Sequence, residues 1–252
     1  MKTAILTGAS SGLGLEFARQ VHSVFPEIQS LWLIARRTDR LEALAEQLPG
    51  LTVKPISLDL TAGDACQRLQ ALLEAEQPEV ELLLNCAGCG FLGDFDQSDL
   101  TEQLRMIDLN IRALTAVTRT VLPHMPQGSR IINISSIASF VPNTRMSVYS
   151  ASKAFVSFFS RGLHEELKPR RISVTAVCPG PMATEFLTVG KIAGNSATFN
   201  RLPYCDPGKV VRGSLLAARK GRAVYTPRGF YKLYRVFSGL IPHAILVHAA
   251  KT

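Results

Sequence analysis

The sequence predicts an α/β fold, a doubly wound parallel sheet of about seven strands with helices on both faces. Short apolar runs alternate with segments of 3.6-residue periodicity, and the runs are continuously apolar, which is typical of strands buried on both faces. The 252-residue length suits one large core, and no repeat or linker divides the chain. We therefore expect residues 1–252 to form a single domain.

Seven apolar runs are predicted as strands and six periodic segments as helices. The strands are expected at 3–8, 31–35, 52–60, 80–85, 130–136, 172–180 and 223–227. The helices are expected at 12–24, 38–48, 63–77, 98–123, 148–168 and 207–220. Ligands of such sheets bind beyond the carboxyl ends of the strands, so function is expected there.

Charge is distributed unevenly along the chain. Residues 1–200 carry 18 Lys and Arg against 19 Asp and Glu, whereas residues 201–252 carry ten basic residues and one acid, Asp206. No motif of a nucleic-acid-binding fold accompanies this excess, so we expect no nucleic-acid partner. No apolar run approaches the ~18 residues that cross a bilayer, and the N-terminus lacks the pattern of a secretory signal. We therefore expect a cytoplasmic protein.

The five cysteines show no disulfide pattern. Cys86 and Cys89 form a C-x-x-C, but no second pair or nearby histidine accompanies them. We interpret them as small residues in a turn after a strand, and we predict no metal site.

The first predicted strand runs into a glycine-rich turn, TGASSGLG, at residues 7–14. Glycines let backbone N–H groups approach a phosphate, and the N-terminus of the following helix favours negative charge. The spacing is G-x-x-x-G-x-G and differs from the commonest dinucleotide fingerprint. We expect this turn to bind a dinucleotide through Gly8, Ser10, Ser11, Gly12, Leu13 and Gly14.

The end of the second strand predicts which dinucleotide is bound. A chain built for NAD has an acid there for the ribose 2′-hydroxyl, whereas this chain has Arg36 and Arg37. Guanidinium groups pair with a 2′-phosphate that a carboxylate would repel. We predict NADP(H) over NAD(H), the alternative being that both arginines are solvated strand-end residues.

Two further strand ends point to the same crevice. Asp59 and Leu60 end the third strand, where an acid can accept a hydrogen bond from the adenine amino group. The fourth strand ends in NCAG, and we expect Asn85, Ala87 and Gly88 to border the adenosine.

The motifs TGASSGLG, NCAG, IDLN, NISS, YSASK and PGPMAT follow one another between Thr3 and about Thr184. As a set they resemble the short-chain dehydrogenase/reductase family. The resemblance implies a Rossmann-type fold and hydride transfer between a nicotinamide and a carbonyl group or secondary alcohol. It also implies that Pro179, Gly180, Met182 and Thr184 border the nicotinamide.

The resemblance assigns four catalytic roles. Tyr149 matches the general acid/base, and Lys153 matches the lysine that lowers the pKa of this tyrosine and holds the nicotinamide ribose. Ser136 matches the serine that hydrogen-bonds the substrate carbonyl; Ser135 would point to the other face of its strand. Asn110 matches the asparagine that holds a water for proton relay.

The spacing of Tyr149 and Lys153 supports this chemistry independently. Side chains at i and i+4 share a helix face, and a cation within ~4–6 Å lowers the pKa of a phenol from its usual value near 10. Hydride transfer to a ketone develops negative charge on oxygen and requires one proton. The alternative is an exposed helix pair without a catalytic role.

The substrate is expected to be a medium-to-large apolar ketone or alcohol, such as a hydroxysteroid, a 3-oxoacyl group or a xenobiotic carbonyl. Residues 185–205 are predicted as a mobile lid over an apolar cleft, and Phe91 and Phe95 as either cleft or core residues. Two other readings stay open: an NADP-binding sensor or scaffold without turnover, and an epimerase or dehydratase that uses the same tyrosine and lysine.

Two segments predict partners. The basic, aromatic segment 228–252 fits an anionic membrane surface, an acyl-carrier contact, a cover for an apolar pocket or a subunit interface. Segment 148–168 has more apolar surface than one helix face needs, and the resemblance implies a homodimer or homotetramer.

Overall fold

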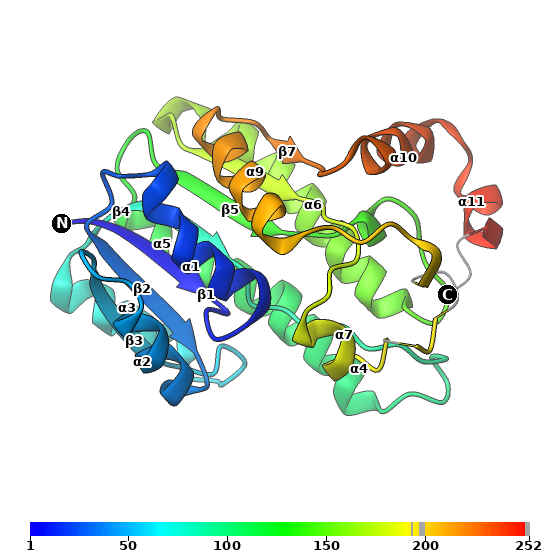
Figure 1. Ribbon diagram of the computed structural model, residues 1–252, viewed down its shortest axis with the longest axis horizontal. Coiled ribbons are helices and arrows are strands. Elements are labelled where there is room, and N and C mark those ends of the chain that lie inside the picture. The colour runs from blue at the N-terminus through cyan, green and yellow to red at the C-terminus, as the bar shows by residue number, and fades with distance from the viewer. Residues whose placement is uncertain (193, 197–199, 250–252) are drawn as a thin grey trace.

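In the computed structural model, which describes residues 1–192, 194–196 and 200–249, seven strands form one sheet (Figure 1). The strand order is β3-β2-β1-β4-β5-β6-β7, and every neighbouring pair is parallel. The predicted doubly wound sheet is confirmed, with its switch point between β1 and β4. The strands are β1 (Lys2–Thr7), β2 (Ser30–Ala35), β3 (Thr52–Ser57), β4 (Glu79–Asn85), β5 (Arg130–Ile134), β6 (Ser173–Val177) and β7 (Val224–Tyr225).

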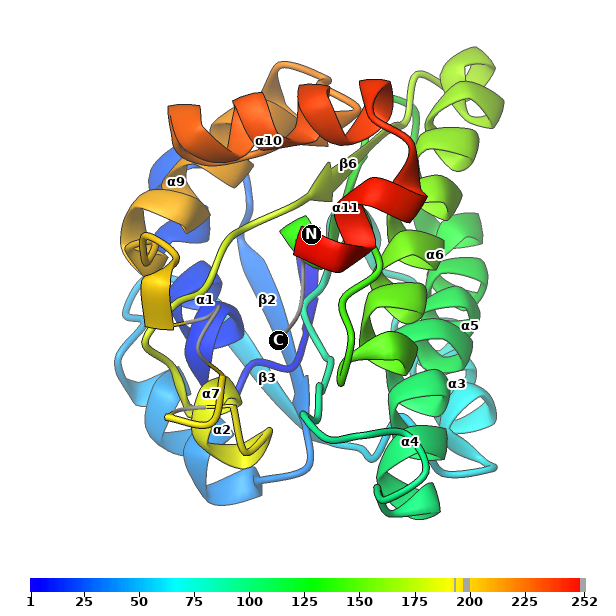
Figure 2. The ribbon, with the colours of Figure 1, turned by 90° about the vertical axis from the view of Figure 1, so that its right-hand side faces the viewer.

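Helices cover both faces of the sheet (Figure 2). One face carries α1 (Gly12–Val24), α2 (Thr38–Glu46) and α9 (Pro207–Arg219), and the other carries α3 (Ala65–Glu76), α5 (Leu114–Val121) and α6 (Ser147–Glu166). Each face has its own apolar core because strand residues point alternately to the two sides. Leu33 packs in the core of the α1 face, and Trp32 packs in the core of the α3 face.

The predicted helix 98–123 is wrong as a single helix. The segment consists of α4 (Leu100–Ile107), a π-helical turn η1 (Asp108–Ala113), α5 and a short 3₁₀ turn η2 (Leu122–His124). Single π-helical turns are uncommon and concentrate at functional sites. Here the turn carries the buried Asn110, whose side chain binds the backbone of Cys89 in a neighbouring loop. This tertiary contact is invisible to helical periodicity.

Short 3₁₀ turns follow two other elements. They are η3 (Ile137–Ser139), which follows β5, and η4 (Lys168–Arg170), which follows α6. In η3, Ser136 caps the turn by accepting a hydrogen bond from the Ala138 N–H at 3.1 Å.

Three further helices lie beyond the carboxyl ends of the strands (Figures 1 and 2). They are α7 (Glu185–Val189), α10 (Gly229–Leu240) and α11 (His243–Ala249). Helix α7 begins the predicted lid 185–205, of which residues 193 and 197–199 lie outside the described residues. Among the described residues, no helix has both the length and the hydropathy that a bilayer crossing requires.

Candidate active site

The carboxyl ends of the strands open into a cavity of about 570 Å³. One end is bordered by the turn after β1 and the end of β2, and the other by α6, α7, α10 and α11. Of the residues predicted to bind the cofactor, all line this cavity except Asn85. Those that line it are Gly8, Ser10, Ser11, Gly12, Leu13, Gly14, Arg36, Arg37, Asp59, Leu60, Ala87, Gly88, Tyr149, Lys153, Pro179, Gly180, Met182 and Thr184.

The expectation that Asn85 borders the adenosine is not met by its side chain. The residue is buried, and its amide nitrogen donates to Thr118 Oγ1 at 3.0 Å and to Asn133 Oδ1 at 2.8 Å. Its backbone continues β4, so the side chain points into the face of the sheet that carries α5. Asn85 supports the strand end from behind the cavity wall.

The glycine turn brings three backbone segments into contact. Gly8 has a positive φ of 70°, and a Cβ there would lie 2.7 Å from the Ala87 nitrogen. A Cβ on Gly14 would lie 2.1 Å from the Gly8 carbonyl oxygen. Helix α1 begins at Gly12, and among the described residues no side chain caps its first turn. These first-turn N–H groups and the surrounding glycines fit a dinucleotide phosphate.

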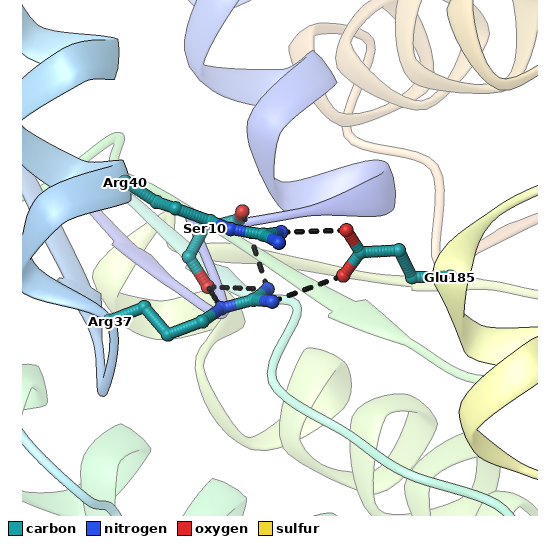
Figure 3. Close-up of polar contacts among 4 residues, drawn as sticks. All are labelled: Ser10, Arg37, Arg40 and Glu185. Carbon is teal, nitrogen blue, oxygen red and sulfur yellow. Dashed lines mark hydrogen bonds and ion pairs between the residues drawn. The ribbon is translucent and has the colours of Figure 1, made fainter.

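Arg37, which directly precedes α2, and Arg40 on α2 lie close to Ser10 of the glycine turn (Figure 3). We call these three residues the anion-binding corner. Arg37 points its guanidinium at the glycine turn, with Nη2 3.1 Å and Nε 3.3 Å from Ser10 Oγ. Its Nη1 also donates to Glu185 at 3.2 Å, and Arg40 donates to the other oxygen of the same carboxylate at 2.6 Å. The donors on Arg37 and Ser10 fit a 2′-phosphate. Arg40 and Glu185 were not found by sequence reasoning, because their contact joins segments 145 residues apart.

Asp59 lies at the wall of the same end. Partial burial alone would raise the pKa of its carboxyl, but two hydrogen bonds from Thr61 lower that pKa below the usual value. The Thr61 N–H and hydroxyl donate to one Asp59 oxygen at 2.9 and 2.7 Å. The carboxylate therefore stays charged near neutral pH and can accept a further hydrogen bond.

Tyr149 and Ser136 meet at the opposite end of the cavity. Tyr149 projects from α6 and is buried, with its ring centroid 5.7 Å from that of Phe186. Burial raises the pKa of Tyr149 to about 12, and a hydrogen bond with the Ser136 side chain lowers it in part. Gly90 makes room for this arrangement, since a Cβ there would lie 2.7 Å from both rings.

Lys153 lies on the same face of α6 as Tyr149. Its Nζ is 5.7 Å from the Tyr149 ring centroid and donates to the Ile134 carbonyl at 2.9 Å. Burial lowers the pKa of Lys153 to about 8. The expected lowering of the Tyr149 pKa therefore does not appear in this structure, because desolvation of the buried phenol outweighs the hydrogen bond with Ser136.

Asn110 lies behind the cavity wall. Its two amide hydrogens go to the Cys89 carbonyl at 2.8 Å and to Ser152 Oγ at 3.0 Å, while its oxygen accepts from the Cys89 N–H at 2.9 Å. A Cβ on Gly88 would lie 3.1 Å from Asn110 Oδ1 and 3.3 Å from Lys153 Nζ. Asn110 thus fixes the loop after β4 against α6, and its role in holding a water stays a prediction.

Apolar side chains form the substrate end of the cavity. Phe91 is buried there, whereas Phe95 is 68% exposed and does not line the cavity. Phe186, from the predicted lid, also lines the cavity. Segment 228–252 contributes Phe230, Tyr231, Tyr234 and Leu246, which agrees with the alternative that this segment covers an apolar pocket. The sequence did not say which of its side chains face the cavity, because that depends on the tertiary fold.

The C-terminal segment is attached through Tyr231. Its ring packs on Gly180, where a Cβ would lie 2.3 Å away, and its hydroxyl donates to the Pro203 carbonyl at 2.7 Å. This buried ring holds α10 beside the segment that follows β6.

The chain matches a known protein family over most of its length. The family model described as short chain dehydrogenase matches residues 2–191. The chain belongs to the short-chain dehydrogenase family. Serine 3-dehydrogenase of Agrobacterium fabrum is 33% identical over 79% of each chain. The very-long-chain 3-oxoacyl-CoA reductase of Anas platyrhynchos is 35% identical over 75% of this chain and 62% of that protein.

Solved structures of a short-chain dehydrogenase and of an alcohol dehydrogenase share this fold. One from Sphingobium yanoikuyae in complex with NADPH has a TM-score of 0.81 and 32% identity over 95% of each chain. The bulky-bulky ketone specific alcohol dehydrogenase from Comamonas testosteroni has a TM-score of 0.76 and 29% identity over 95% of this chain and 93% of that chain. The predicted family and oxidoreductase class are confirmed, while the named substrates of the relatives differ widely.

Proposed function

We propose that this short-chain dehydrogenase uses NADP(H) to interconvert a carbonyl and a secondary alcohol on a medium-to-large apolar substrate, with Tyr149 as general acid/base. The observation that carries the proposal is that the two ends of the cavity differ in their chemistry. Its β2 end has an arginine and serine corner suited to a phosphate, and its α6 end has a buried phenol and hydroxyl surrounded by apolar side chains.

The cofactor choice rests on the chain and on its relatives. Arg37 and Ser10 present donors at the corner where the adenosine ribose is expected, and the first acid after β2, Asp39, comes two residues beyond Arg37. The Sphingobium yanoikuyae relative was solved with NADPH. When bound, the dinucleotide supplies the hydride to the carbonyl carbon or accepts it from the alcohol carbon.

The chain's own groups handle the proton. In reduction, the Tyr149 hydroxyl donates its proton to the carbonyl oxygen as the carbonyl carbon gains the hydride, and the phenolate then takes a proton from solvent. Ser136 donates a hydrogen bond to the same oxygen and so stabilises its developing negative charge. In alcohol oxidation the phenolate accepts the hydroxyl proton. The high pKa of Tyr149 keeps the phenol protonated at neutral pH and favours the reductive role.

The apolar substrate class is supported by the lining of the α6 end. Phe91, Phe186, Leu187, Phe230 and Tyr234 contribute to the cavity wall there. Such a surface gains affinity from the apolar area it covers, at roughly 25 cal/mol per Å². An unbranched or bulky ketone suits it better than a small charged aldehyde.

The test is an assay of NADPH oxidation over a panel of apolar ketones with the wild type and Tyr149→Phe. The variant keeps the ring and its packing but removes the proton, so kcat should fall about 10²–10⁴-fold while the NADPH dissociation constant stays within twofold. An active variant would refute the role of Tyr149. A wild type that binds NADPH but turns over no carbonyl would favour the sensor alternative.

We further propose a homodimer formed through α4 and α6. Both helices expose apolar side chains to solvent, among them Leu100, Leu104, Phe155 and Phe158, the last 74% exposed. Phe158→Asp should convert the dimer to a monomer in light scattering after gel filtration. A wild type that is monomeric at micromolar concentration contradicts the proposal.

An exposed face of α10 supports contact with an anionic membrane surface. Its large apolar side chains are each at least half exposed, and they are Phe230, Leu233, Val236, Phe237 and Leu240. Residues 201–252 contain ten basic residues and one acid, which complements anionic lipid. The same helix lines the cavity through Phe230, Tyr231 and Tyr234, so a lipid-like substrate could enter beside it.

Liposome flotation tests this contact. Vesicles containing phosphatidylserine should carry the protein upward at low salt, and Leu233→Asp should abolish this, while vesicles of phosphatidylcholine serve as the control. No salt-sensitive flotation would exclude the membrane, and concentration-dependent self-association lost in Leu233→Asp would instead assign the face to a second copy. The cytoplasmic location stays a prediction.

A further inference from the structure

A carboxylate from the lid occupies the anion-binding corner near the end of β2 (Figure 3). Glu185, the first residue of α7, bridges two guanidinium groups: Oε2 lies 3.2 Å from Arg37 Nη1, and Oε1 lies 2.6 Å from Arg40 Nη1. We call this set of contacts the Glu185 bridge. It joins the start of the lid to the β2–α2 connection across the cavity, and Glu185 itself lines that cavity.

The bridge lies where a 2′-phosphate is expected to bind. Arg37 contacts Glu185 through Nη1 while Nη2 and Nε point at Ser10 in the glycine turn, so one guanidinium serves both groups. A carboxylate in this position resembles a phosphate oxygen in charge and in hydrogen-bond geometry. The hydrogen bond from Arg40, and to a smaller extent that from Arg37, lowers the pKa of Glu185. The Glu185 carboxyl is therefore an anion at neutral pH.

The same lid segment has a second ion pair away from the cofactor corner. Lys191 donates to Glu102 on α4 at 2.9 Å. Residues 185–191 are therefore held on the β2 side by the Glu185 bridge and on the α4 side by Lys191. The second pair can be removed without changing the charge beside Arg37.

We propose that Glu185 is a specificity-determining residue, an internal anion that competes with the cofactor 2′-phosphate for Arg37. The proposal rests on the proposed NADP(H) dependence. A bound 2′-phosphate takes the Arg37 donors from Glu185, which releases the start of α7 from the β2 side. NAD(H) lacks this phosphate and leaves the bridge in place, so Glu185 lowers the affinity for NADP(H) relative to NAD(H).

The expected effect is moderate because the bridge is partly exposed. Exposed ion pairs contribute little individually, since water and salt screen them. The side chains of Arg37 and Glu185 are 39% and 47% exposed. Two such contacts, together with like-charge repulsion of the phosphate, correspond to about a three- to tenfold change in the NADPH dissociation constant.

The test is a fluorescence titration of the full-length protein with NADPH and with NADH, which needs no turnover. Glu185→Gln keeps the side-chain shape and removes the charge, so it should tighten NADPH about three- to tenfold and leave NADH within twofold. Adenosine 2′,5′-bisphosphate and AMP, used as fragments, should show the same contrast. Glu102→Gln is the matched control, because it frees the lid at Lys191 and should change neither dissociation constant.

A double-mutant cycle assigns the effect to Arg37. In an Arg37→Gln background, Glu185→Gln should tighten NADPH less than it does in the wild type, because the competition for Arg37 is gone and only the repulsion of the phosphate by Glu185 remains. Weaker NADPH binding in Glu185→Gln, an equal change for NADH, or the same gain in Glu102→Gln would each overturn the proposal. A wild type that binds NADH as tightly as NADPH would instead overturn the NADP(H) dependence itself.

Discussion

The two ends of the cavity are built in different ways. At the cofactor end the wall is backbone against backbone: the Gly8 turn contacts the loop after β4, and Gly14 contacts Gly8. At the substrate end the wall consists of side chains from α6, α7, α10 and α11, and Gly90 and Gly180 receive rings rather than backbone. Backbone cannot move aside as a ring can, so the cofactor end should tolerate fewer changes than the substrate end.

The largest effect expected from this comparison is the loss of stability caused by a substitution at Gly14. A Cβ there would lie 2.1 Å from the Gly8 oxygen, so Gly14→Ala should lower the free energy of unfolding by about 3 kcal/mol or more and impair dinucleotide binding. Gly63→Ala is the control, since no described atom beyond its chain neighbours lies within 4 Å of the Cβ that it would add. Urea denaturation measures both, and an unaffected Gly14→Ala would break the comparison.

The chemistry at the substrate end predicts a steep pH dependence. With the Tyr149 pKa raised to about 12 by burial, the phenolate fraction rises about tenfold per pH unit at neutral pH. The kcat/KM for alcohol oxidation should therefore rise about a hundredfold from pH 6 to 8, the range below the Lys153 pKa of about 8. A plateau within that range would mean that the charge on Lys153 lowers the Tyr149 pKa more than burial raises it in the free enzyme.

The anion-binding corner predicts a smaller, selective effect. Arg37→Gln removes a charged donor, and such hydrogen bonds contribute ~1.5–3 kcal/mol, which screening at this half-exposed site reduces. We expect NADPH to bind about tenfold more weakly and NADH to bind within twofold of the wild type. Parallel titrations measure this, and equal losses for the two dinucleotides would point to damage of the whole cofactor end.

The smallest expected effect concerns the attachment of α10. Tyr231→Phe removes the hydrogen bond to the Pro203 carbonyl but keeps the buried ring, so stability should fall by about 1 kcal/mol. Tyr204→Phe, at a partly exposed tyrosine, should stay within about 0.5 kcal/mol. Thermal unfolding separates them, and equal melting temperatures for Tyr231→Phe and wild type would show that ring packing alone holds the helix.

The cofactor end could be predicted from local sequence because its parts are strand ends. Gly8, Arg37, Asp59 and Gly88 each lie within three residues of the end of a predicted strand, and parallel strands deliver their carboxyl ends to one edge. Asn85 shows the limit of this reasoning. It occupies a strand end too, but the alternation of the strand turns its side chain to the far face, toward Thr118 and Asn133.

By itself the sequence determined the sheet, its seven strands and the pairing of Tyr149 with Lys153 on one helix face, since these follow from periodicities of two and 3.6 residues. The tertiary structure alone decided how charge is balanced and what closes the cavity. Burial raises the phenol's pKa, a π-helical turn brings Asn110 to Cys89, and Glu185 reaches Arg40 across 145 residues. Solvation and long-range contact depend on which atoms surround a group in space, and no local pattern records that.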